Sequence, residues 1–134
     1  MSTEARTASR LPANYDAIRQ AIDADGPGSH HTTAEIYDRV RRIRPKIGYS
    51  TVQRGLARLV ELGHVLAVRL PDEGGVRYEP RTRAHGHFLC SACGSVLDVP
   101  YTLPQQTVER LSAELGVVVQ DHSVALVGRC RACT

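Results

Sequence analysis

All four cysteines of the 134-residue chain fall into two C-x-x-C pairs. In each pair, two thiolates can converge on one ion at the zinc–sulfur distance of about 2.3 Å. The pairs are separated by the 36 residues from Gly94 to Arg129, so a shared site would tie the C-terminus back to an earlier strand. The spacing predicts one structural zinc ion with four sulfur ligands: Cys90, Cys93, Cys130 and Cys133.

Two disulfides, or a redox-active dithiol, are the competing interpretations of these pairs. Disulfides are disfavoured in a reducing cytosol. A thioredoxin-like pair opens a helix, whereas Gly94-Ser95-Val96-Leu97 after Cys93 has the pattern of a turn that leads into a strand. Both observations favour zinc, and loss of the ion is expected to loosen the second half of the chain.

A second group of possible metal ligands begins just before the first cysteine pair. His85 and His87 are two residues apart, and alternate residues of a strand point to the same side. Two surface histidines are the simpler interpretation of this pair alone. Together with His30, Glu79 and Asp98 they would form a mixed nitrogen and oxygen set, although the spacing does not establish that the five meet. Such a set suits Fe(II), Mn(II) or Zn(II), and its carboxylates favour the harder ions.

The first half of the chain has the pattern of three helices. Apolar residues recur at helical spacing between residues 17 and 22, and Gly26-Pro27-Gly28 ends that helix. A capping box at Thr32-x-x-Glu35 begins the second helix, and Pro45 ends it. A further capping box at Ser50-x-x-Gln53 predicts the start of the third helix, which ends at Gly63. Inside it, Gly55 could let the helix lie close to another surface.

A hairpin follows the third helix. Residues 64–70 and 76–79 have strand patterns, and a Pro-Asp-Glu-Gly-Gly turn joins them. Three helices followed by a two-stranded hairpin predict a winged helix, in which the third helix enters the major groove of DNA. We therefore predict a winged helix-turn-helix domain over residues 1–79.

The second half reads as a small α/β unit. Short strand patterns occupy residues 87–90, 95–99 and 117–126, and a helix begins near Pro104 and closes at Gly116. We predict an α+β protein whose second domain, residues 80–134, carries the four-cysteine site.

Charge differs between the two halves. Residues 1–70 hold 11 Lys/Arg and 7 Asp/Glu, a net of +4, whereas residues 71–134 hold 6 and 7, a net of −1. The first half is therefore the candidate nucleic-acid face, with an ordinary solvated surface as the alternative. No apolar run of about 20 residues could span a bilayer, and the polar N-terminus lacks a signal segment. We expect a soluble cytoplasmic protein without a membrane partner.

Four runs carry a resemblance to the ferric uptake regulator (Fur) family, which covers residues 15–134. They read HHTTAEIYDRV, STVQRGLARLVELGHV, RYEPRTRAHGHFLCSACGSVLDV and DHSVALVGRCRACT. The resemblance implies a homodimeric repressor that binds a double-stranded DNA operator. It further implies an N-terminal winged helix, a C-terminal α/β dimerisation domain, a structural zinc and a regulatory metal site at the domain hinge.

The resemblance also implies roles for individual residues. The four cysteines match the structural zinc ligands. The regulatory ligands, for Fe(II) or Mn(II) with Zn(II) also possible, match His30, Glu79, His85, His87 and Asp98. The DNA-binding set on the third helix is Tyr49, Ser50, Thr51, Gln53, Arg54 and Arg58. A further metal site of some members is expected to be absent, because its positions hold Ala84, Gly86 and Gln105, and only His122 remains.

Two features leave the sensed signal and the operator open. Asp98 is typical of the peroxide-sensing (PerR) branch, whereas Glu79 is typical of metal sensors, so we expect peroxide sensing with a plain iron, manganese or zinc sensor as the alternative. The family's TVYR run is Thr51-Val52-Gln53-Arg54 here. Gln53 could bond an adenine edge, or it could be a solvated glutamine.

An enzyme is the rival interpretation of the histidine and carboxylate set. The sequence contains no H-E-x-x-H, no nucleophile elbow and no other catalytic motif. A thiol redox switch at the cysteine pairs is a second rival. We expect a regulator and no enzymatic activity.

Overall fold

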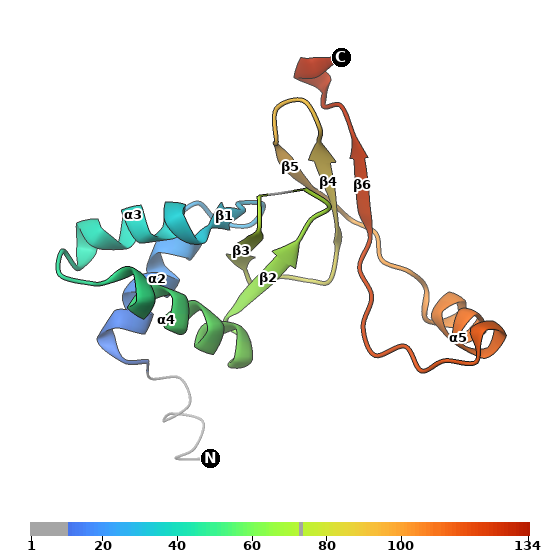
Figure 1. Ribbon diagram of the computed structural model, residues 1–134, viewed down its shortest axis with the longest axis horizontal. Coiled ribbons are helices and arrows are strands. Elements are labelled where there is room, and N and C mark those ends of the chain that lie inside the picture. The colour runs from blue at the N-terminus through green and yellow to red at the C-terminus, as the bar shows by residue number, and fades with distance from the viewer. Residues whose placement is uncertain (1–10, 73) are drawn as a thin grey trace. The chain divides into compact units, whose positions relative to one another are not determined.

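The computed structural model describes residues 11–72 and 74–134, and it divides into two compact units between Thr82 and Arg83. Helices dominate the first unit and strands the second (Figure 1). Whether the two predicted domains, divided after Glu79, fold independently stays a prediction. None of the helices formed by the described residues combines the length and apolar character needed to cross a lipid bilayer.

The first unit contains the three predicted helices and the predicted hairpin. The helices are α2 (Ala13–Asp23), α3 (Thr33–Ile43) and α4 (Tyr49–Glu61). Strands β2 (Val65–Arg69) and β3 (Val76–Pro80) pair antiparallel, and the short strand β1 (His31–Thr32), which the sequence did not predict, pairs with the other edge of β3. The sheet order is β1-β3-β2.

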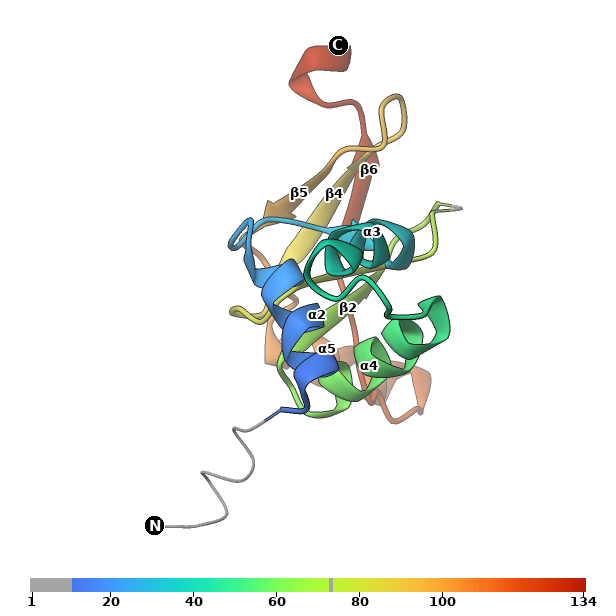
Figure 2. The ribbon, with the colours of Figure 1, turned by 90° about the vertical axis from the view of Figure 1, so that its left-hand side faces the viewer.

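The helices α2, α3 and α4 lie against one another (Figure 2), and a core of aliphatic side chains holds them together. Ile18 and Ile22 of α2, Val40 of α3, and Leu56 and Leu59 of α4 are completely buried. Each such side chain contributes about 1.5–3 kcal/mol through removal of its apolar surface from water. The core therefore fixes α4 against α2 and α3, and it leaves the opposite face of α4 exposed.

Gly55 allows α2 to approach α4. A Cβ atom at this position would lie 2.5 Å from Cδ1 of Ile18 and 3.2 Å from Cδ1 of Tyr15. Both distances are too short for normal carbon–carbon packing, so a side chain at position 55 would displace Ile18 and Tyr15 from their places against α4. The sequence predicted that Gly55 lets its helix lie close to another surface, and that surface is α2.

The two predicted capping boxes have different outcomes. The box of α3 is confirmed: the Glu35 N–H donates to Thr32 Oγ1 (3.3 Å), and the Thr32 N–H donates to Glu35 Oε1 (2.8 Å). The box of α4 is wrong, because α4 begins earlier, at Tyr49, with Gly48 at the N-cap and no side-chain cap. The bond from the Val52 N–H to the Gly48 carbonyl (3.2 Å) closes the first turn. Gln53 therefore lies inside the helix.

The second unit is built on a three-stranded sheet. Its central strand β4 (Gly86–Cys90) pairs antiparallel with β5 (Val96–Val99) and parallel with β6 (Ala125–Gly128). The predicted strand over 117–126 is wrong before Ala125. Ala125 already pairs with His87, near the start of β4, and the His87 N–H donates to the Val124 carbonyl (3.0 Å). Residues before Val124 extend past the start of β4, so they do not continue this pairing. The helix α5 (Gln105–Leu115) stands away from this sheet (Figure 1), and the turn η1 (Arg131–Cys133) ends the chain.

Candidate metal centres

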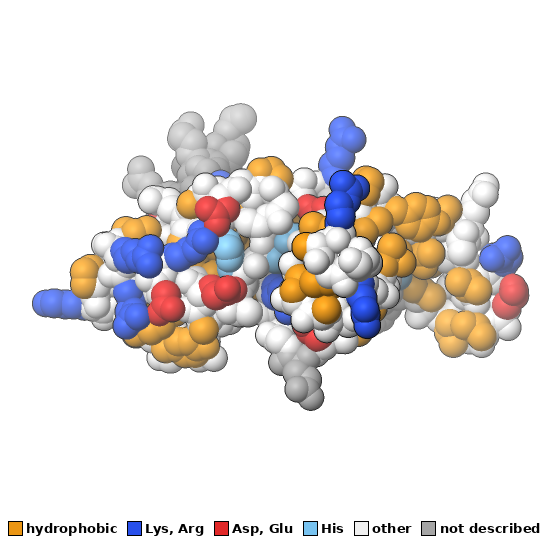
Figure 3. Space-filling model, turned by 90° about the horizontal axis from the view of Figure 1, so that it is seen from above, with side chains coloured by type: hydrophobic (Ala, Val, Ile, Leu, Met, Phe, Trp, Pro, Cys, Tyr) orange, Lys and Arg blue, Asp and Glu red, His pale blue; other side chains and the backbone are white. Residues whose placement is uncertain are grey.

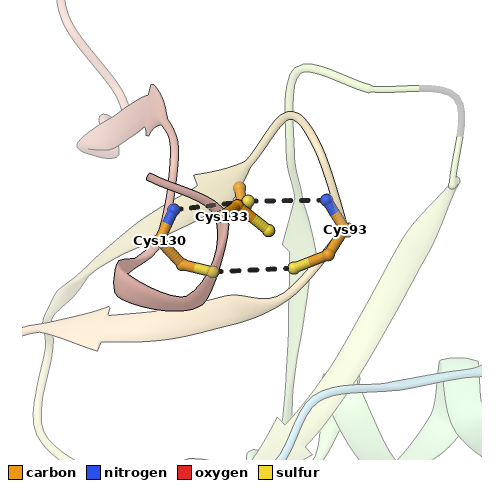
Figure 4. Close-up of side chains that lie close together, drawn as sticks. Cys93, Cys130 and Cys133 are labelled. Atoms are coloured by element: carbon orange, nitrogen blue, oxygen red, sulfur yellow. Dashed lines mark hydrogen bonds between the residues drawn. The ribbon is translucent and has the colours of Figure 1, made fainter.

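The two cysteine pairs meet at one end of the second unit. Cys90 ends β4 and Cys93 lies in the following turn, while Cys130 and Cys133 lie after β6. The parallel pairing of β4 with β6 places Cys90 beside Gly128, which carries the C-terminal pair to the first pair. All four sulfur atoms lie within 4.8 Å of one another, and those of Cys93 and Cys130 are 3.7 Å apart (Figure 4). None of the four forms a disulfide.

Hydrogen bonds prepare part of this cluster for a cation. The N–H groups of Cys130 (3.3 Å) and Cys93 (3.4 Å) point at Sγ of Cys90, and they lower the pKa of that thiol to about 6. The Ser95 hydroxyl, 2.9 Å from Sγ of Cys93, lowers the pKa of Cys93. The neighbouring sulfur of Cys130, followed by those of Cys93 and Cys90, raises the pKa of Cys133 to about 12.

The raised pKa of the Cys133 thiol has an electrostatic origin. Several thiolates confined within a few ångströms repel one another, so the cluster alone keeps one thiol protonated. A divalent ion at the centre would offset the negative charge and allow all four sulfurs to bind as thiolates. The donor set and its compact arrangement fit a tetrahedral metal with sulfur ligands.

We expect replacement of Cys133 by serine to remove the metal. A hydroxyl is a poor substitute for a thiolate ligand, and metal binding contributes folding free energy to a unit with few buried apolar residues. Elemental analysis after dialysis against a chelator should fall from about one zinc per chain to almost none, with a lower melting temperature. Ser91→Ala is the matched control, because the Ser91 hydroxyl bonds the Gly128 carbonyl in the same region without reaching a sulfur. Full metal retention in Cys133→Ser would contradict the assignment.

A second group of ligands lies at the other end of β4. The antiparallel register pairs His87 with Asp98 of β5. The Nε2 atoms of His85 and His87 lie 3.3 Å and 3.9 Å from the same oxygen, Oδ1 of Asp98, and the two imidazole rings are 4.6 Å apart. The strand register therefore brings these three predicted ligands together within the second unit.

The orientation of His85 bears on what this group can bind. Its Nδ1 lies 2.6 Å from the carbonyl oxygen of Arg83, and a carbonyl only accepts, so Nδ1 is the donor. In the neutral ring, Nε2 then carries a lone pair directed at a carboxylate oxygen of Asp98. Two acceptors that face each other need a proton or a cation between them. This group fits a metal ion that accepts nitrogen and oxygen ligands.

The first unit carries the other two predicted ligands. His30 precedes β1, and because His31 pairs with Tyr78, His30 comes opposite Glu79 of β3. Its Nε2 lies 2.7 Å from Oε2 of Glu79. The five predicted regulatory ligands thus form two groups, one within each unit. Their union around one ion stays a prediction.

The positions of the further metal site offer little room. A Cβ atom on Gly86 would lie 3.0 Å from the Val124 carbonyl oxygen and 3.2 Å from that of Tyr101. An acidic side chain there would force backbone to move, since neither neighbour is a flexible side chain. This packing agrees with the expected absence of that site.

The predicted DNA-binding residues lie on the exposed part of α4. The helix buries Val52, Gly55, Leu56 and Leu59, and the remaining positions face outward or flank that side. Tyr49 is 42% exposed, and its ring meets the ring of Tyr37 edge to face at 5.2 Å. Arg54 donates to Thr51 (3.3 Å), and Arg58 pairs with Glu61 (3.6 Å).

On the face of the helical unit that Figure 3 shows, several Lys and Arg side chains stand among a few acidic ones. Arg39 is bound to Asp25 (2.7 Å), and the Arg41 guanidinium lies 4.7 Å from the centre of the Tyr37 ring. Arg44 and Lys46 are exposed, and together with Asn14 they line a hollow beside the start of α4. Exposed cations beside a helix that faces outward can contact phosphates, which position a protein without reading sequence.

Sequence reasoning missed three polar contacts around these sites. The Arg83 carbonyl orients His85, the Ser95 hydroxyl bonds Cys93, and Arg81 donates to the Gly63 carbonyl (3.1 Å) at the end of α4. Each partner is an ordinary polar residue or a backbone group. No composition or spacing distinguishes such partners, because their role comes from tertiary proximity.

The sequence was compared with protein families and with known proteins. The sequence pattern of the ferric uptake regulator family matches residues 14–127. The ferric uptake regulation protein of Bacillus subtilis is 30% identical over 108 residues, which cover 78% of this chain and 72% of that protein. The peroxide-responsive repressor PerR of Staphylococcus aureus is 29% identical over 107 residues, 78% of this chain and 70% of that protein.

A solved structure shares the fold. The ferric uptake regulator from Francisella tularensis with iron matches with a TM-score of 0.73 at 18% identity, covering 92% of this chain and 93% of that one. The α+β fold class, with a helical DNA-binding domain and a second domain that holds four cysteines, is thereby confirmed. Because the family pattern spans most of the sequence, this chain belongs to the ferric uptake regulator family: it is a metal-responsive, DNA-binding transcription regulator and not an enzyme.

Proposed function

We propose that this chain is a homodimeric cytoplasmic repressor whose DNA affinity depends on Fe(II) or Mn(II) and whose iron form senses hydrogen peroxide. The regulatory ligands are His30, Glu79, His85, His87 and Asp98. The observation that carries the proposal is the convergence of Nε2 of His85 and Nε2 of His87 on Oδ1 of Asp98, at 3.3 Å and 3.9 Å. A second set of four sulfur ligands takes zinc.

The two donor sets differ in the metal that each prefers. Thiolates select soft or borderline ions such as Zn(II), whereas carboxylates mixed with imidazoles accommodate Fe(II), Mn(II) and also Zn(II). The cysteine cluster can therefore keep its zinc while the imidazole and carboxylate set exchanges ions with the cell. Only the second set is suited to report metal availability.

Control of DNA binding follows from ligands supplied by both units. His30 and Glu79 would hold the ion from the winged helix, and His85, His87 and Asp98 would hold it from the second unit. Binding then favours the relative orientation in which all five ligands reach the ion. An ion shifts such an equilibrium only by the difference in its affinity for the two states. Coupling free energies of about 1–3 kcal/mol correspond to changes of about 5- to 150-fold in DNA affinity.

We expect His87→Ala to abolish metal-dependent DNA binding and to leave the zinc in place. The substitution removes a central imidazole of the regulatory set but no sulfur ligand. DNA affinity would be measured with and without Mn(II), without oxygen, on a duplex selected from a random library by the manganese-loaded protein. The variant should lose the about 5- to 150-fold enhancement by manganese. His122→Ala is the control, because His122 lies in the segment before β6 and should retain the enhancement.

Elemental analysis of the same samples separates the two sites. The wild type should bind zinc and manganese, and His87→Ala should bind zinc alone. Loss of zinc in His87→Ala would show that the two ligand sets were assigned incorrectly.

Peroxide sensing rests on Asp98 as the carboxylate partner of His85 and His87. A bound Fe(II) would activate hydrogen peroxide beside its imidazole ligands. One peroxide oxygen would be inserted into the ring of His30 or His85, and the other would leave as water. An oxidised imidazole is a poorer ligand, so the metal and then the DNA would be released. A plain iron, manganese or zinc sensor is the alternative, since relatives from both branches are about equally similar.

Stoichiometric peroxide added to the iron-loaded protein should release DNA and add one oxygen atom to a peptide containing His30 or His85. Mass spectrometry of the digested protein identifies the site. The manganese-loaded protein is the control and should show neither change. Retention of DNA and unmodified histidines in the iron form would favour the plain metal sensor, whereas early zinc loss with cysteine oxidation would favour a thiol switch.

Homodimer formation is supported by apolar surface on the second unit. Strand register places Phe88, Leu97 and Leu126 in one row on one face of the sheet, and Leu97 and Leu126 are 53% and 50% exposed. Further exposed aliphatic residues follow α5, among them Val118 at 86%. Apolar surface of this extent on a small unit is typical of an interface. We propose that a second copy covers it.

We expect Leu126→Glu to weaken the dimer, because the charge would be buried without a partner. Light scattering coupled to size exclusion should show a concentration-dependent shift towards monomer. Leu126→Met, which preserves apolar volume, is the control and should remain dimeric. A monomeric wild type at all concentrations would refute the proposed interface.

A further inference from the structure

The exposed face of α4 consists of a narrow stripe of residues. The stripe consists of Ser50, Gln53, Arg54 and Ala57, which follow one another at steps of three, one and three positions along the chain. This spacing places them along one side of a helix. All four are exposed, and the buried residues of α4 occupy the opposite side. A helix inserted into the major groove along this stripe would present these side chains to base edges.

The long polar side chains of this face differ in whether they bond to other side chains of the protein. The Arg54 guanidinium donates to Thr51 (3.3 Å), and the Arg58 guanidinium pairs with Glu61 (3.6 Å). By contrast, no described residue forms a hydrogen bond with the side-chain amide of Gln53. Because α4 begins at Tyr49, this amide does not fold back to cap the helix. Gln53 thus presents both a donor and an acceptor to a partner outside the chain.

The surroundings of Gln53 restrict where its amide can point. One turn before it lies Tyr49, whose ring is held edge to face against Tyr37 of α3. One turn after it lies Ala57, whose methyl group leaves open space. Tyr37 is itself covered by the Arg41 guanidinium, 4.7 Å from the ring centre. Gln53 therefore lies between Tyr49, whose ring is packed against Tyr37, and Ala57, whose small side chain leaves space beside the amide.

The amide of glutamine matches one base edge in the major groove. Adenine offers an acceptor at N7 beside a donor at the N6 amino group, so a glutamine amide can bond both. Guanine offers two acceptors at the same place and can satisfy only the amide donor. We propose that Gln53 selects an A·T pair at one position of each operator half-site. This inference rests on the proposed binding of DNA through α4.

Base substitution in the operator tests this inference. The manganese-loaded full chain would select a duplex from a random library, and affinity would then be measured with each of the four base pairs at every position. At one position per half-site, the wild type should prefer A·T by about 5- to 150-fold. Gln53→Ala should lose that preference and keep the others. Glu109→Gln, an exposed change on α5, should alter no base preference.

Analogues of adenine identify the contacting atoms. At the selected position, 7-deazaadenine lacks the N7 acceptor, and purine lacks the 6-amino donor. Each analogue should weaken binding of the wild type and leave the binding of Gln53→Ala unchanged. Gln53→Glu retains the shape but only accepts, so its preference should move to cytosine, whose N4 amino group donates in the groove.

The outcomes separate this inference from the proposed function. Metal-dependent binding of the selected duplex with unchanged base preferences in Gln53→Ala and Gln53→Glu would overturn the role of Gln53 alone. Failure of the wild type to bind any duplex in the presence of manganese would overturn the proposed function and this inference with it. Circular dichroism and zinc content of each variant should equal those of the wild type, since position 53 is exposed.

Discussion

The pairing of β4 with its two neighbours is the interaction on which the second unit depends. The antiparallel register with β5 sets Asp98 across from His87, and the parallel register with β6 sets Gly128 beside Cys90. One five-residue strand therefore carries a ligand of each metal set. A shift of register by one residue would turn every side chain of the strand to the other face and would separate both sets.

Such a dependence explains how a small unit can hold two chemically different sites. Its buried apolar residues are few, and its helix stands away from the sheet, so the register cannot rest on a large core. Hydrogen bonds of the strands set the register, and the sulfur cluster at the end of β4 closes the loop from Cys93 to Cys130. A bound ion there adds a cross-link whose stabilisation comes from neutralising thiolates that otherwise repel. In the proposed function, the imidazole and carboxylate set would exchange its ion on a scaffold that the first ion maintains.

The first unit solves a different problem, which is to hold one helix firmly while leaving a face of it exposed. Ile18 contacts α4 at Gly55, where an added side chain would displace Ile18 and Tyr15. The Thr32–Glu35 capping box sets the start of α3, and Gly63 ends α4 with a positive φ of 79°. Because buried apolar residues hold the helix in place, exposed polar residues such as Gln53 can contact another molecule without loss of the core.

Local sequence patterns determined much of this protein. Helical periodicity, capping residues and the hairpin predicted the three helices and the wing, because those patterns reflect contacts between residues near in sequence. The C-x-x-C spacing predicted the cluster, since two ligands per pair are already local. The resemblance to the ferric uptake regulator family contributed the regulatory ligand set, which spacing alone left undecided.

Only the tertiary structure decided the remaining features. Helix α4 begins at Tyr49 with Gly48, and not Ser50, at the N-cap, and Val52 of its first turn is completely buried and donates to the Gly48 carbonyl. Strand β6 begins at Ala125 because its parallel partner β4 begins just there, with His87 opposite Ala125, although Val117–Val119 have the same strand propensity. The Arg83 carbonyl orients His85, and the Ser95 hydroxyl bonds Cys93, through proximity that no spacing encodes. Composition and periodicity report which residues tend to form an element, whereas a contact partner is chosen by the three-dimensional path of the chain.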